Sequence, residues 1–348
     1  EGRDSIRGYR ERRRYAEQSD AGVPFPAPEK SALEVAPEER QRRYKTGWER
    51  GGINALSYAF TDFFTDPEAN ATAAEFARER IREVVRDPAV AEALSPGHHI
   101  GTKRTCVDIG YYETYNRDNV ELVDLRRSPI VEITPRAIRT ANAEYEVDSI
   151  VFAIGFDAIT GPLLDIDIRG TGGLTLRQKW SEGPRTCLGL ACAGFPNLFM
   201  VTGPGSPSVL SNTVVSIEQH VEWIVDCIAH LAERGLDRVE ATVEAEDAWL
   251  DHVNELADAT LYPVANSWYV GANIPGKPRV FMPYVAGCGA YRSECEAVVA
   301  KGYEGFVMGA PRELPTVEAS VQAWPKQPAR VASLLAVAPP SERGSARS

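Results

Sequence analysis

The spacing of apolar residues divides the chain into a helical front, a strand-rich middle and two long helices. Helices are predicted at Pro37–Trp48 and after Asp66–Pro67, where proline and acidic residues suit a first helical turn. From about residue 105 the period shortens, and β-branched runs predict short strands. The predicted strands are Val120–Leu125, Ile130–Ile133, Ile138–Thr140, Glu144–Val147 and Ser149–Ile154, with a later one at Leu198–Val201. The run Ser149–Ile154 is apolar almost throughout, which predicts a central strand covered on both faces.

The second half of the chain predicts two amphipathic helices. The first follows from apolar residues at spacings of three and four over roughly five turns. These residues are Val214, Ile217, Val221, Ile224, Ile228 and Leu231. The second helix covers about residues 244–260, with Trp249, Val253 and Leu256 on one side. Beyond Ala310, prolines interrupt a stretch rich in Ala, Ser and Arg, so we expect residues 310–348 to be mostly disordered.

A Gly-Pro-Gly-Ser loop, residues 203–206, joins the strand at Leu198–Val201 to the first of these helices. Its position is that of the Gly-x-Gly-x-x-Gly turn that cradles a dinucleotide pyrophosphate. Ser208 stands where the third glycine would be, and Pro204 and Pro207 remove two amide donors. The pattern therefore argues against a pyrophosphate cradle. It leaves open an ordinary strand-to-helix connection, or a loop that presents amides and hydroxyls to the edge of a ligand.

Composition excludes several classes of function. The 348 residues, 43% of them hydrophobic, suffice for one large or two ordinary domains with a cleft. A net charge of -11 without a basic stripe makes nucleic acid an unexpected partner. Apolar runs are too short to cross a bilayer and the front is charged, so we expect no membrane contact and a soluble, cytoplasmic protein. The six cysteines form no Cys-x-x-Cys pair, so we expect buried thiols and no metal site.

Longer segments carry a resemblance to a known family. They are Gly101–Arg104, Asp108–Val120, Ala153–Asp157, Gly194–Phe199, Gly203–Ser208, Ser267–Lys277 and Tyr303–Phe306. In order and spacing, from about residue 25 to 308, they resemble the Baeyer–Villiger monooxygenases of the phenylacetone and cyclohexanone monooxygenase group. The resemblance implies an enzyme that uses FAD, NADPH and O2 to convert a ketone into an ester or lactone.

The resemblance also implies roles for single residues. Arg104 corresponds to the family's essential arginine, which lies over the flavin and stabilises negative charge during oxygen transfer. Lys103 corresponds to the lysine at the 2'-phosphate of NADPH, and Trp268 to a tryptophan on a mobile loop that closes over the nicotinamide ribose. On the residues alone, a solvated basic pair is the favoured interpretation of Lys103 and Arg104, and a core aromatic is the alternative for Trp268.

Two further segments are assigned in the same way. The element Ala153–Asp157, at the junction of the nucleotide domains, implies cofactor contacts by Gly155 and Asp157, although Ile154 replaces the usual threonine. In the loop after residue 203, the resemblance implies cofactor contacts by Ser211 and Thr213. It also implies a substrate-shaping bulge at Ser208, Val209 and Leu210. The loop is thus expected at the flavin and substrate edge.

The family's glycine-rich signatures are missing from the sequence. Neither dinucleotide fingerprint nor the Phe-x-Gly-x-x-x-His motif occurs. The expected fold is therefore α/β, a partial flavoprotein of two dinucleotide-binding domains with a helical subdomain, in which the N-terminal Rossmann halves are missing. Predicted parts are 1–100, the helical subdomain of the NADP domain; 101–157, the rest of that domain; 158–309, part of the FAD domain; and 310–348, a tail.

These absences shape the functional expectation. Without the fingerprint amides, both pyrophosphates lack their main anchors, so we expect the isolated chain to bind FAD poorly and to turn over little. Two alternatives stay open. The chain is a non-catalytic remnant that self-associates through a truncated sheet edge, or it comes from a related flavin monooxygenase that oxidises nitrogen or sulfur.

Overall fold

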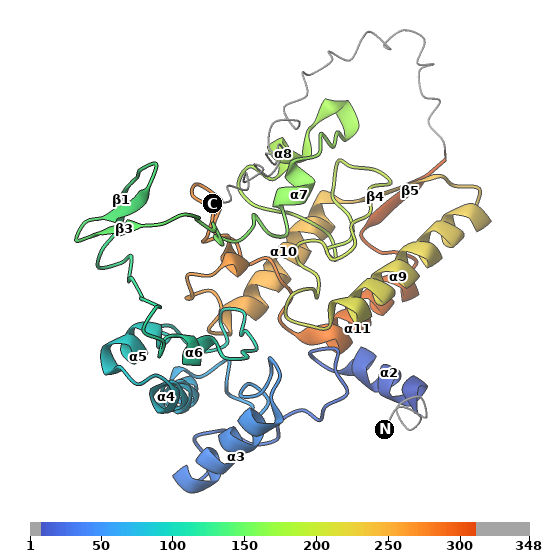
Figure 1. Ribbon diagram of the computed structural model, residues 1–348. Helices are drawn as coiled ribbons and strands as arrows, with labels where there is room; N and C mark the ends of the chain where they lie inside the picture. The colour runs from blue at the N-terminus through green and yellow to red at the C-terminus, as the bar shows by residue number, and fades with distance from the viewer. Residues whose placement is uncertain (1–7, 311–348) are drawn as a thin grey trace, which may run out of the picture. The chain divides into compact units, whose positions relative to one another are not determined.

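The front of the chain is helical in the computed structural model, which describes residues 8–310 (Figure 1). Its helices are α2 (Tyr9–Gln18), α3 (Pro37–Arg50), α4 (Pro67–Val84), α5 (Pro88–Leu94) and α6 (Tyr111–Thr114). The predicted starts at Pro37 and Pro67 are confirmed. The Asp66 carboxylate caps α4 by accepting from the amides of Glu68 and Ala69, at 2.7 and 3.0 Å.

The helical front holds the turn that ends at Arg104. Tyr44, Phe60, Phe63 and Phe76 form the core between α3 and α4. Asn70, fully buried on α4, donates to the carbonyls of Phe63 and Ile100 and accepts from the Ile100 amide, each at 2.9 Å. Because a buried amide side chain is costly to leave unpaired, these bonds fix Ile100 on the helix and set the start of the Gly101–Arg104 turn.

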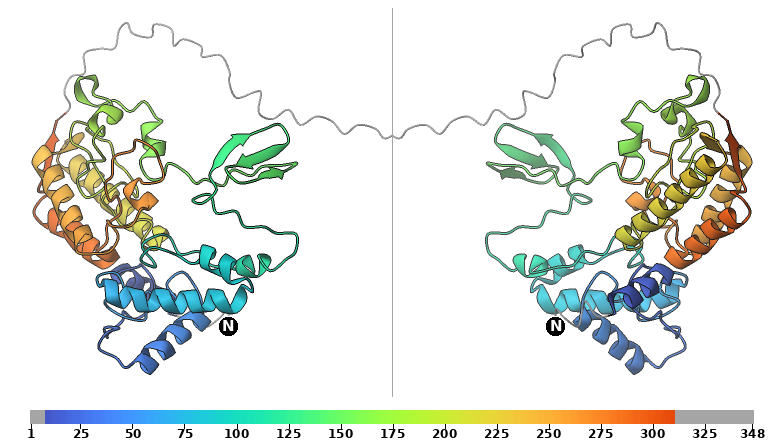
Figure 2. Two further views of the ribbon diagram at one scale, coloured as in Figure 1. Left: turned by 90° about the vertical axis from the view of Figure 1, so that its left-hand side faces the viewer. Right: turned by 90° about the vertical axis from the view of Figure 1, so that its right-hand side faces the viewer.

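Two antiparallel sheets follow. β1 (Ile130–Ile133), β2 (Ala137–Thr140) and β3 (Glu144–Glu146) pair in that order, and Figure 2 shows these green strands side by side. β4 (Arg238–Ala241) pairs with β5 (Phe306–Gly309). The three strands predicted around residues 130, 138 and 144 are confirmed, whereas β4 and β5 were not predicted. This mixture of helix and sheet is consistent with an α/β protein, although both sheets of the described residues are antiparallel.

Three predicted strands are wrong. Val120–Leu125, Ser149–Ile154 and Leu198–Val201 have no strand assignment. The largest discrepancy is at Ser149–Ile154, predicted to be central and covered, where Val151 and Ile154 are 87% and 82% exposed. A strand exists only where a neighbouring backbone accepts its ladder bonds, and the described residues supply no neighbour here.

The remaining helices surround a second core. They are α7 (Gly161–Leu164), α8 (Leu176–Lys179), α9 (Thr213–Glu233), α10 (Val243–Asp258) and α11 (Gly287–Ala300), with 3-10 turns η1 (Thr171–Gly173) and η2 (Trp268–Val270). Trp223 of α9, Trp249 of α10 and Tyr291 of α11 meet in this core. The helices predicted at α9 and α10 are confirmed, and α11 was not predicted. As expected, five cysteines are buried free thiols, while Cys106 is exposed.

The described residues belong to one compact unit, and the domain boundaries near residues 100 and 157 stay predictions. The predicted disorder of residues 310–348 concerns positions that, except for Ala310, lie outside the described residues. Within the described range, no helix is both long and apolar enough to cross a membrane.

Candidate functional site

Arg104 joins two segments that lie far from it in sequence. Its guanidinium donates through Nη1 to the backbone carbonyl of Val209. It also lies against the phenol of Tyr269, the neighbour of Trp268. Burial raises the pKa of Tyr269, and the charge and hydrogen bond of Arg104 partly offset that rise. The turn ending at Arg104, the loop of Val209 and the loop of Trp268 therefore meet at one guanidinium.

An apolar cluster surrounds this meeting point. Its buried members are Ala257, Tyr262, Tyr269, Val270 and Phe281. Val209, Leu210 and Trp268 pack against it while staying partly exposed, and the rings of Trp268 and Tyr269 lie 4.5 Å apart. Two of the predicted substrate residues and the predicted lid tryptophan thus share one apolar surface. Ser208, the third predicted substrate residue, is only 5% exposed.

The loop after residue 203 uses its polar groups internally. The Gly205 amide donates to Met282 at 2.7 Å and the Ser206 amide to Gly203 at 3.2 Å, while Pro204 and Pro207 have no amide proton. The Gly205 carbonyl accepts from Trp249 Nε1 at 3.0 Å. Gly205 has φ +81°, and a Cβ there would lie 3.1 Å from the indole nitrogen of Trp249. Residues 204–207 therefore offer no amide to a phosphate.

The predicted cofactor hydroxyls after this loop are also engaged. Ser211 Oγ lies 3.0 Å from Ser216 Oγ, and Thr213 Oγ1 donates to the Ser208 carbonyl at 3.2 Å. Asn212 caps α9 by accepting from the Val214 amide. These contacts shape the bulge at Ser208 and anchor it on the first turn of α9.

His220 holds the backbone at Thr202, directly before the loop. This role was not predicted from the sequence. Its fully buried ring accepts the Thr202 amide at Nδ1, 3.0 Å away. Thr202 has φ +56°, a conformation that a β-branched residue seldom adopts, just before Gly203. Burial lowers the pKa of His220 to about 4, so the ring is neutral near pH 7. The one sign of this role in the sequence was a histidine in the predicted helix that is not among its periodic apolar residues.

The predicted junction element contacts the Trp268 loop. Lys277 Nζ donates to Asp157 Oδ1 at 2.5 Å and to the Ala158 carbonyl at 3.0 Å. Asn273 Nδ2 donates to the Phe156 carbonyl at 2.9 Å. Gly155 itself is exposed, with φ +85°. The carboxylate of Asp157, predicted to contact a cofactor, is thus paired with a lysine of this chain.

Lys103 is half-buried and lies close enough to His98 for its charge to act on that ring. Burial lowers the pKa of His98, and the charges of Lys103 and His99 lower it further. Although Lys103 and Arg104 are adjacent in sequence, their charged groups therefore lie near different residues. Arg104 contacts the Val209 carbonyl and the Tyr269 phenol, while the charge of Lys103 acts on His98.

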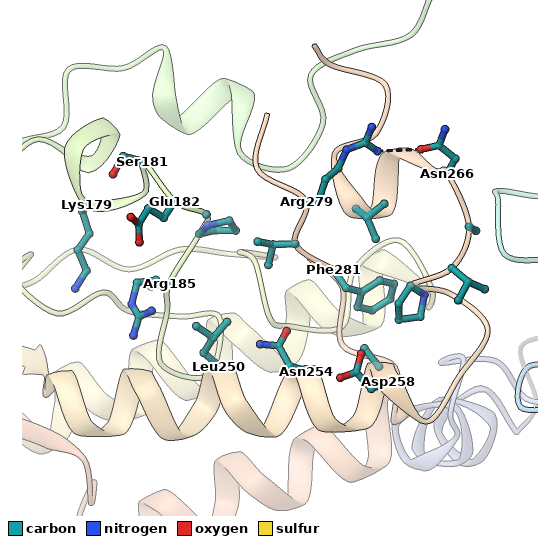
Figure 3. A pocket seen from close by; sticks show the side chains of 18 residues that line it. Lys179, Ser181, Glu182, Arg185, Leu250, Asn254, Asp258, Asn266, Arg279 and Phe281 are labelled. Atoms are coloured by element: carbon teal, nitrogen blue, oxygen red, sulfur yellow. Dashed lines mark hydrogen bonds between the residues drawn. The ribbon is translucent and has the colours of Figure 1, made fainter. Parts of the chain in front are cut away.

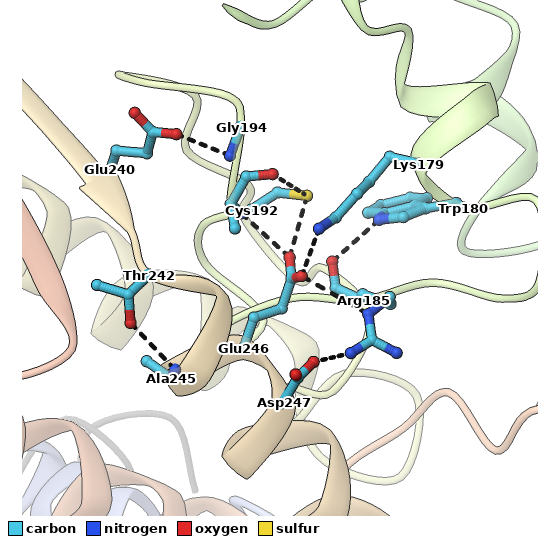
Figure 4. A network of polar contacts seen from close by, with 11 residues as sticks. Lys179, Trp180, Arg185, Cys192, Gly194, Glu240, Thr242, Ala245, Glu246 and Asp247 are labelled. Atoms are coloured by element: carbon cyan, nitrogen blue, oxygen red, sulfur yellow. Dashed lines mark hydrogen bonds and ion pairs between the residues drawn. The ribbon is translucent and has the colours of Figure 1, made fainter.

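A buried carboxylate holds the backbone at Ala193 (Figure 4). Glu246 of α10 is fully buried, and its Oε1 accepts from the Ala193 amide at 3.1 Å. Its Oε2 lies 2.6 Å from Lys179 Nζ and 3.6 Å from Arg185 Nε. Arg185 pairs in addition with Asp247. This ion cluster ties α8, α10 and the backbone at Ala193 together.

A cavity of about 620 Å³ opens along α10 on the side of this cluster (Figure 3). Leu250, Asn254 and Asp258 of α10 face it, and Val270 and Phe281 are shared with the Tyr269 cluster. Its cations are engaged, since Lys179 and Arg185 pair with Glu246, and Arg279 donates to Asn266 at 3.0 Å. The cavity is therefore poorly suited to a phosphate. No cluster with metal-ligand geometry occurs among residues 8–310.

Comparison with known proteins adds to this geometry. No family model matches the chain. The chain is 46% identical over 275 residues to a Baeyer–Villiger monooxygenase of Pseudooceanicola batsensis, covering 78% of this chain and 50% of that protein. It is 40% identical over 280 residues to a phenazine N-monooxygenase of Lysobacter antibioticus, covering 80% and 51%. The chain thus spans about half the length of the curated relatives that it matches.

Solved structures agree. An oxidised steroid monooxygenase bound to NADP superposes with a TM-score of 0.82 at 51% identity, over 88% of this chain and 58% of that one. The protein OTEMO, solved in complex with FAD and NADP, superposes with a TM-score of 0.84 at 38% identity, over 88% of this chain and 57% of that one. Identities this high over this length establish common descent with named monooxygenases.

Proposed function

We propose that this chain, a homologue of the Baeyer–Villiger monooxygenases over about half of their length, supplies the substrate-facing part of an FAD- and NADPH-dependent monooxygenase. The substrate is a ketone, and O2 provides the inserted oxygen of the ester or lactone. The observation that carries the proposal is the position of Arg104, whose guanidinium contacts both the Val209 loop and Tyr269.

Arg104 carries a permanent positive charge into an apolar surface. Reduced FAD, when bound, supplies the oxygen-transfer chemistry with O2. The part of this chain is electrostatic, because a fixed guanidinium beside the ketone stabilises negative charge that grows on the carbonyl oxygen. The Val209 carbonyl and Tyr269 hold the guanidinium in place, so little reorganisation is needed when that charge appears.

The apolar cluster selects the substrate and excludes water. Val209, Leu210 and Trp268 are partly exposed on the surface around Arg104, so they are free to contact a hydrocarbon skeleton. Closure of the Trp268 loop over this surface would remove water, which strengthens the electrostatic effect of Arg104. The contacts of Lys277 and Asn273 with residues 156–158 hold that loop in position.

The described residues fit the ring end of FAD and not its pyrophosphate. The exposed guanidinium and the partly exposed aromatic surface suit a flat, electron-rich ring system. In the loop that most resembles a phosphate-binding turn, the amides of Gly205 and Ser206 donate to the carbonyls of Met282 and Gly203. We therefore infer that this chain alone binds FAD weakly and that turnover needs polypeptide equivalent to the unmatched part of its relatives.

The test begins with the visible spectrum of the purified chain after FAD is added and excess is removed. Retained flavin absorbance would contradict the inferred weak binding, and colourless protein is expected. The same chain, combined with the unmatched part of a relative, is then assayed for NADPH oxidation. Stimulation by ketones and not by amines supports the proposed reaction, and no stimulation by any ketone rejects it.

A second candidate has one observation in its favour. The phenazine N-monooxygenase that is 40% identical to this chain is named for oxidation at nitrogen. Stimulation of NADPH oxidation by aromatic nitrogen compounds, and not by ketones, would favour this activity in the same assay. A chain that gives neither response in the combined preparation is a non-catalytic remnant.

A further inference from the structure

Helix α9 has an apolar face that none of the described residues covers. Its inner face packs into the core through Val215, Trp223 and Cys227. Five branched aliphatic residues at spacings of three and four lie on the opposite side. They are Val214, Ile217, Val221, Val225 and Ile228, exposed by 63, 38, 44, 56 and 51%. We call these five residues the α9 stripe. A continuous stripe of this size on a well-packed helix indicates an interaction surface.

The segment Ser149–Ile154 is uncovered as well. It has the composition of a buried parallel strand, yet it pairs with no strand, and Val151, Phe152 and Ile154 are exposed by 87, 68 and 82%. An unpaired apolar strand leaves both its side chains and its backbone groups without partners. This segment therefore needs a strand beside it, while the α9 stripe needs a flat apolar face.

Parallel sheet structure of an α/β protein offers both kinds of surface. Helices cover its faces, and strands add at its edges. The relatives contain roughly as much polypeptide again as they share with this chain, since the matches cover 50% of one relative and 58% of a solved one. Two surfaces are left open here, and the relatives have the additional chain to cover them.

We propose that the α9 stripe and Ser149–Ile154 are docking surfaces for parallel β-sheet carried by the part of the relatives that this chain does not match. On docking, Ser149–Ile154 becomes a strand. A second copy of this chain is a poorer occupant, because each copy carries a net charge of -11 and the sheets of the described residues are antiparallel. The proposal rests on the family relationship stated above and not on the reaction.

The test is complementation by separate chains. The unmatched part of the Pseudooceanicola batsensis relative is produced together with this chain. The molar mass of the complex is then measured by light scattering without FAD or NADPH. One-to-one assembly is expected, with slowed amide exchange in Ser149–Ile154. Replacing Val221 and Val225 together by glutamate should reduce co-purification at least about tenfold, because assembly would bury two unpaired charges.

Replacing Ala297 and Ala300 together by glutamate is the matched control. It adds the same two charges at exposed positions of α11, away from the stripe, and should assemble like the wild type. Failure of the wild type to assemble, or equal assembly of the Val221 and Val225 double variant, overturns the proposal. So does a dimer of this chain alone that the double variant abolishes. If the double variant does not fold, unchanged exchange of Ser149–Ile154 in the wild-type mixture decides against it. A complex that forms but oxidises no NADPH with ketones rejects the proposed reaction only.

Discussion

Lys277 donates a hydrogen bond to Asp157 across 120 positions of sequence, and its side chain is only 10% exposed. The same ammonium donates to the Ala158 carbonyl, so it holds two groups of one segment. This contact ties the end of the Trp268 loop to the element that contains Gly155. The loop predicted to be mobile and the junction predicted to contact a cofactor are therefore linked by one cation.

Replacing Asp157 by asparagine should loosen this loop without unfolding the protein. Asp157 is 43% exposed, so solvent screens the pair and its effect on global stability is below about 1 kcal/mol. The effect on the loop itself is larger, because the ammonium of Lys277, whose side chain is only 10% exposed, loses its charged partner. We expect amide exchange over residues 267–277 to rise severalfold by mass spectrometry, with an unchanged midpoint of urea unfolding.

Glu304→Gln serves as the control for this variant, since it removes the partner of Lys301 in another exposed pair. It should leave exchange over residues 267–277 as in the wild type. Equal exchange in Asp157→Asn and the wild type would show that the lysine contact does not hold the loop.

Glu246→Gln should destabilise the whole unit. Glu246 is fully buried. Replacing it by glutamine removes its charge and leaves the ammonium of Lys179, whose side chain is 16% exposed, without a counter-ion. Breaking a buried pair by changing one partner typically costs about 3 kcal/mol. We expect a loss of this order in the free energy of urea unfolding. Glu244→Gln, an exposed change in the first turn of α10, should stay within about 0.5 kcal/mol of the wild type. A smaller loss for Glu246 than for Glu244 would contradict the role given to this network.

The sequence correctly predicted elements that are stabilised by residues close to one another along the chain. The first-turn proline Pro37, the Asp66 cap and the periodicity of α9 and α10 were sufficient, because helix starts and amphipathic turns need few distant partners. Strand prediction failed where a strand depends on neighbours from elsewhere, as at Ser149–Ile154. Periodicity predicted the helix α9 but not its buried side. Ile224 and Leu231 of the six apolar residues pack in the core, and the other four are exposed. The side with aromatic Trp223 is buried, and the purely aliphatic stripe is outside.

The candidate site was predictable only in part. The segments around Arg104, Val209 and Trp268 were identified from resemblance, and the structure brings them together, although their roles stay predictions. The supporting contacts of His220 and Glu246 were missed, because a single titratable residue on a helix gives no pattern. Only the fold shows that each of these side chains reaches a backbone amide far away in sequence.

The stability of the unit should fall in acid because of His220. Its pKa is about 4 in the folded state, below the usual value of about 6.5 for an unfolded chain. Between these values the unfolded chain binds more protons, so the stability contributed by the neutral ring is present above pH 6.5 and is lost as the pH falls toward 4. The full difference is about 3 kcal/mol.

His220→Asn tests this assignment. Asparagine places an oxygen near the position of Nδ1 and does not titrate, so it can keep the Thr202 hydrogen bond while the acid dependence weakens. We expect the gap in unfolding free energy between wild type and variant to narrow as the pH drops from 6.5 to 4, measured by urea unfolding at each pH. A gap that stays constant over this range would mean that another group causes the acid sensitivity.

Arg104→Ala should separate the two halves of the proposed reaction. In the complemented protein with FAD bound, reduction by NADPH does not need the guanidinium, whereas ester formation depends on its charge. Losing one preorganised donor at a developing oxyanion typically costs about 10²- to 10³-fold in rate. Ester yield by gas chromatography should fall by this factor while the flavin still bleaches with NADPH. Arg139→Ala, at an exposed arginine of β2, should leave both steps unchanged.

A readout on the isolated chain keeps this prediction independent of cofactor. Because Arg104 lowers the pKa of Tyr269 against the effect of burial, Arg104→Ala should raise that pKa further, and the tyrosinate absorbance should titrate at higher pH. Arg104→Lys keeps the charge but loses the planar group that spans the Val209 carbonyl and the phenol, so ester formation should recover only in part. Normal ester yield in Arg104→Ala, together with an unchanged Tyr269 titration, would remove Arg104 from the site.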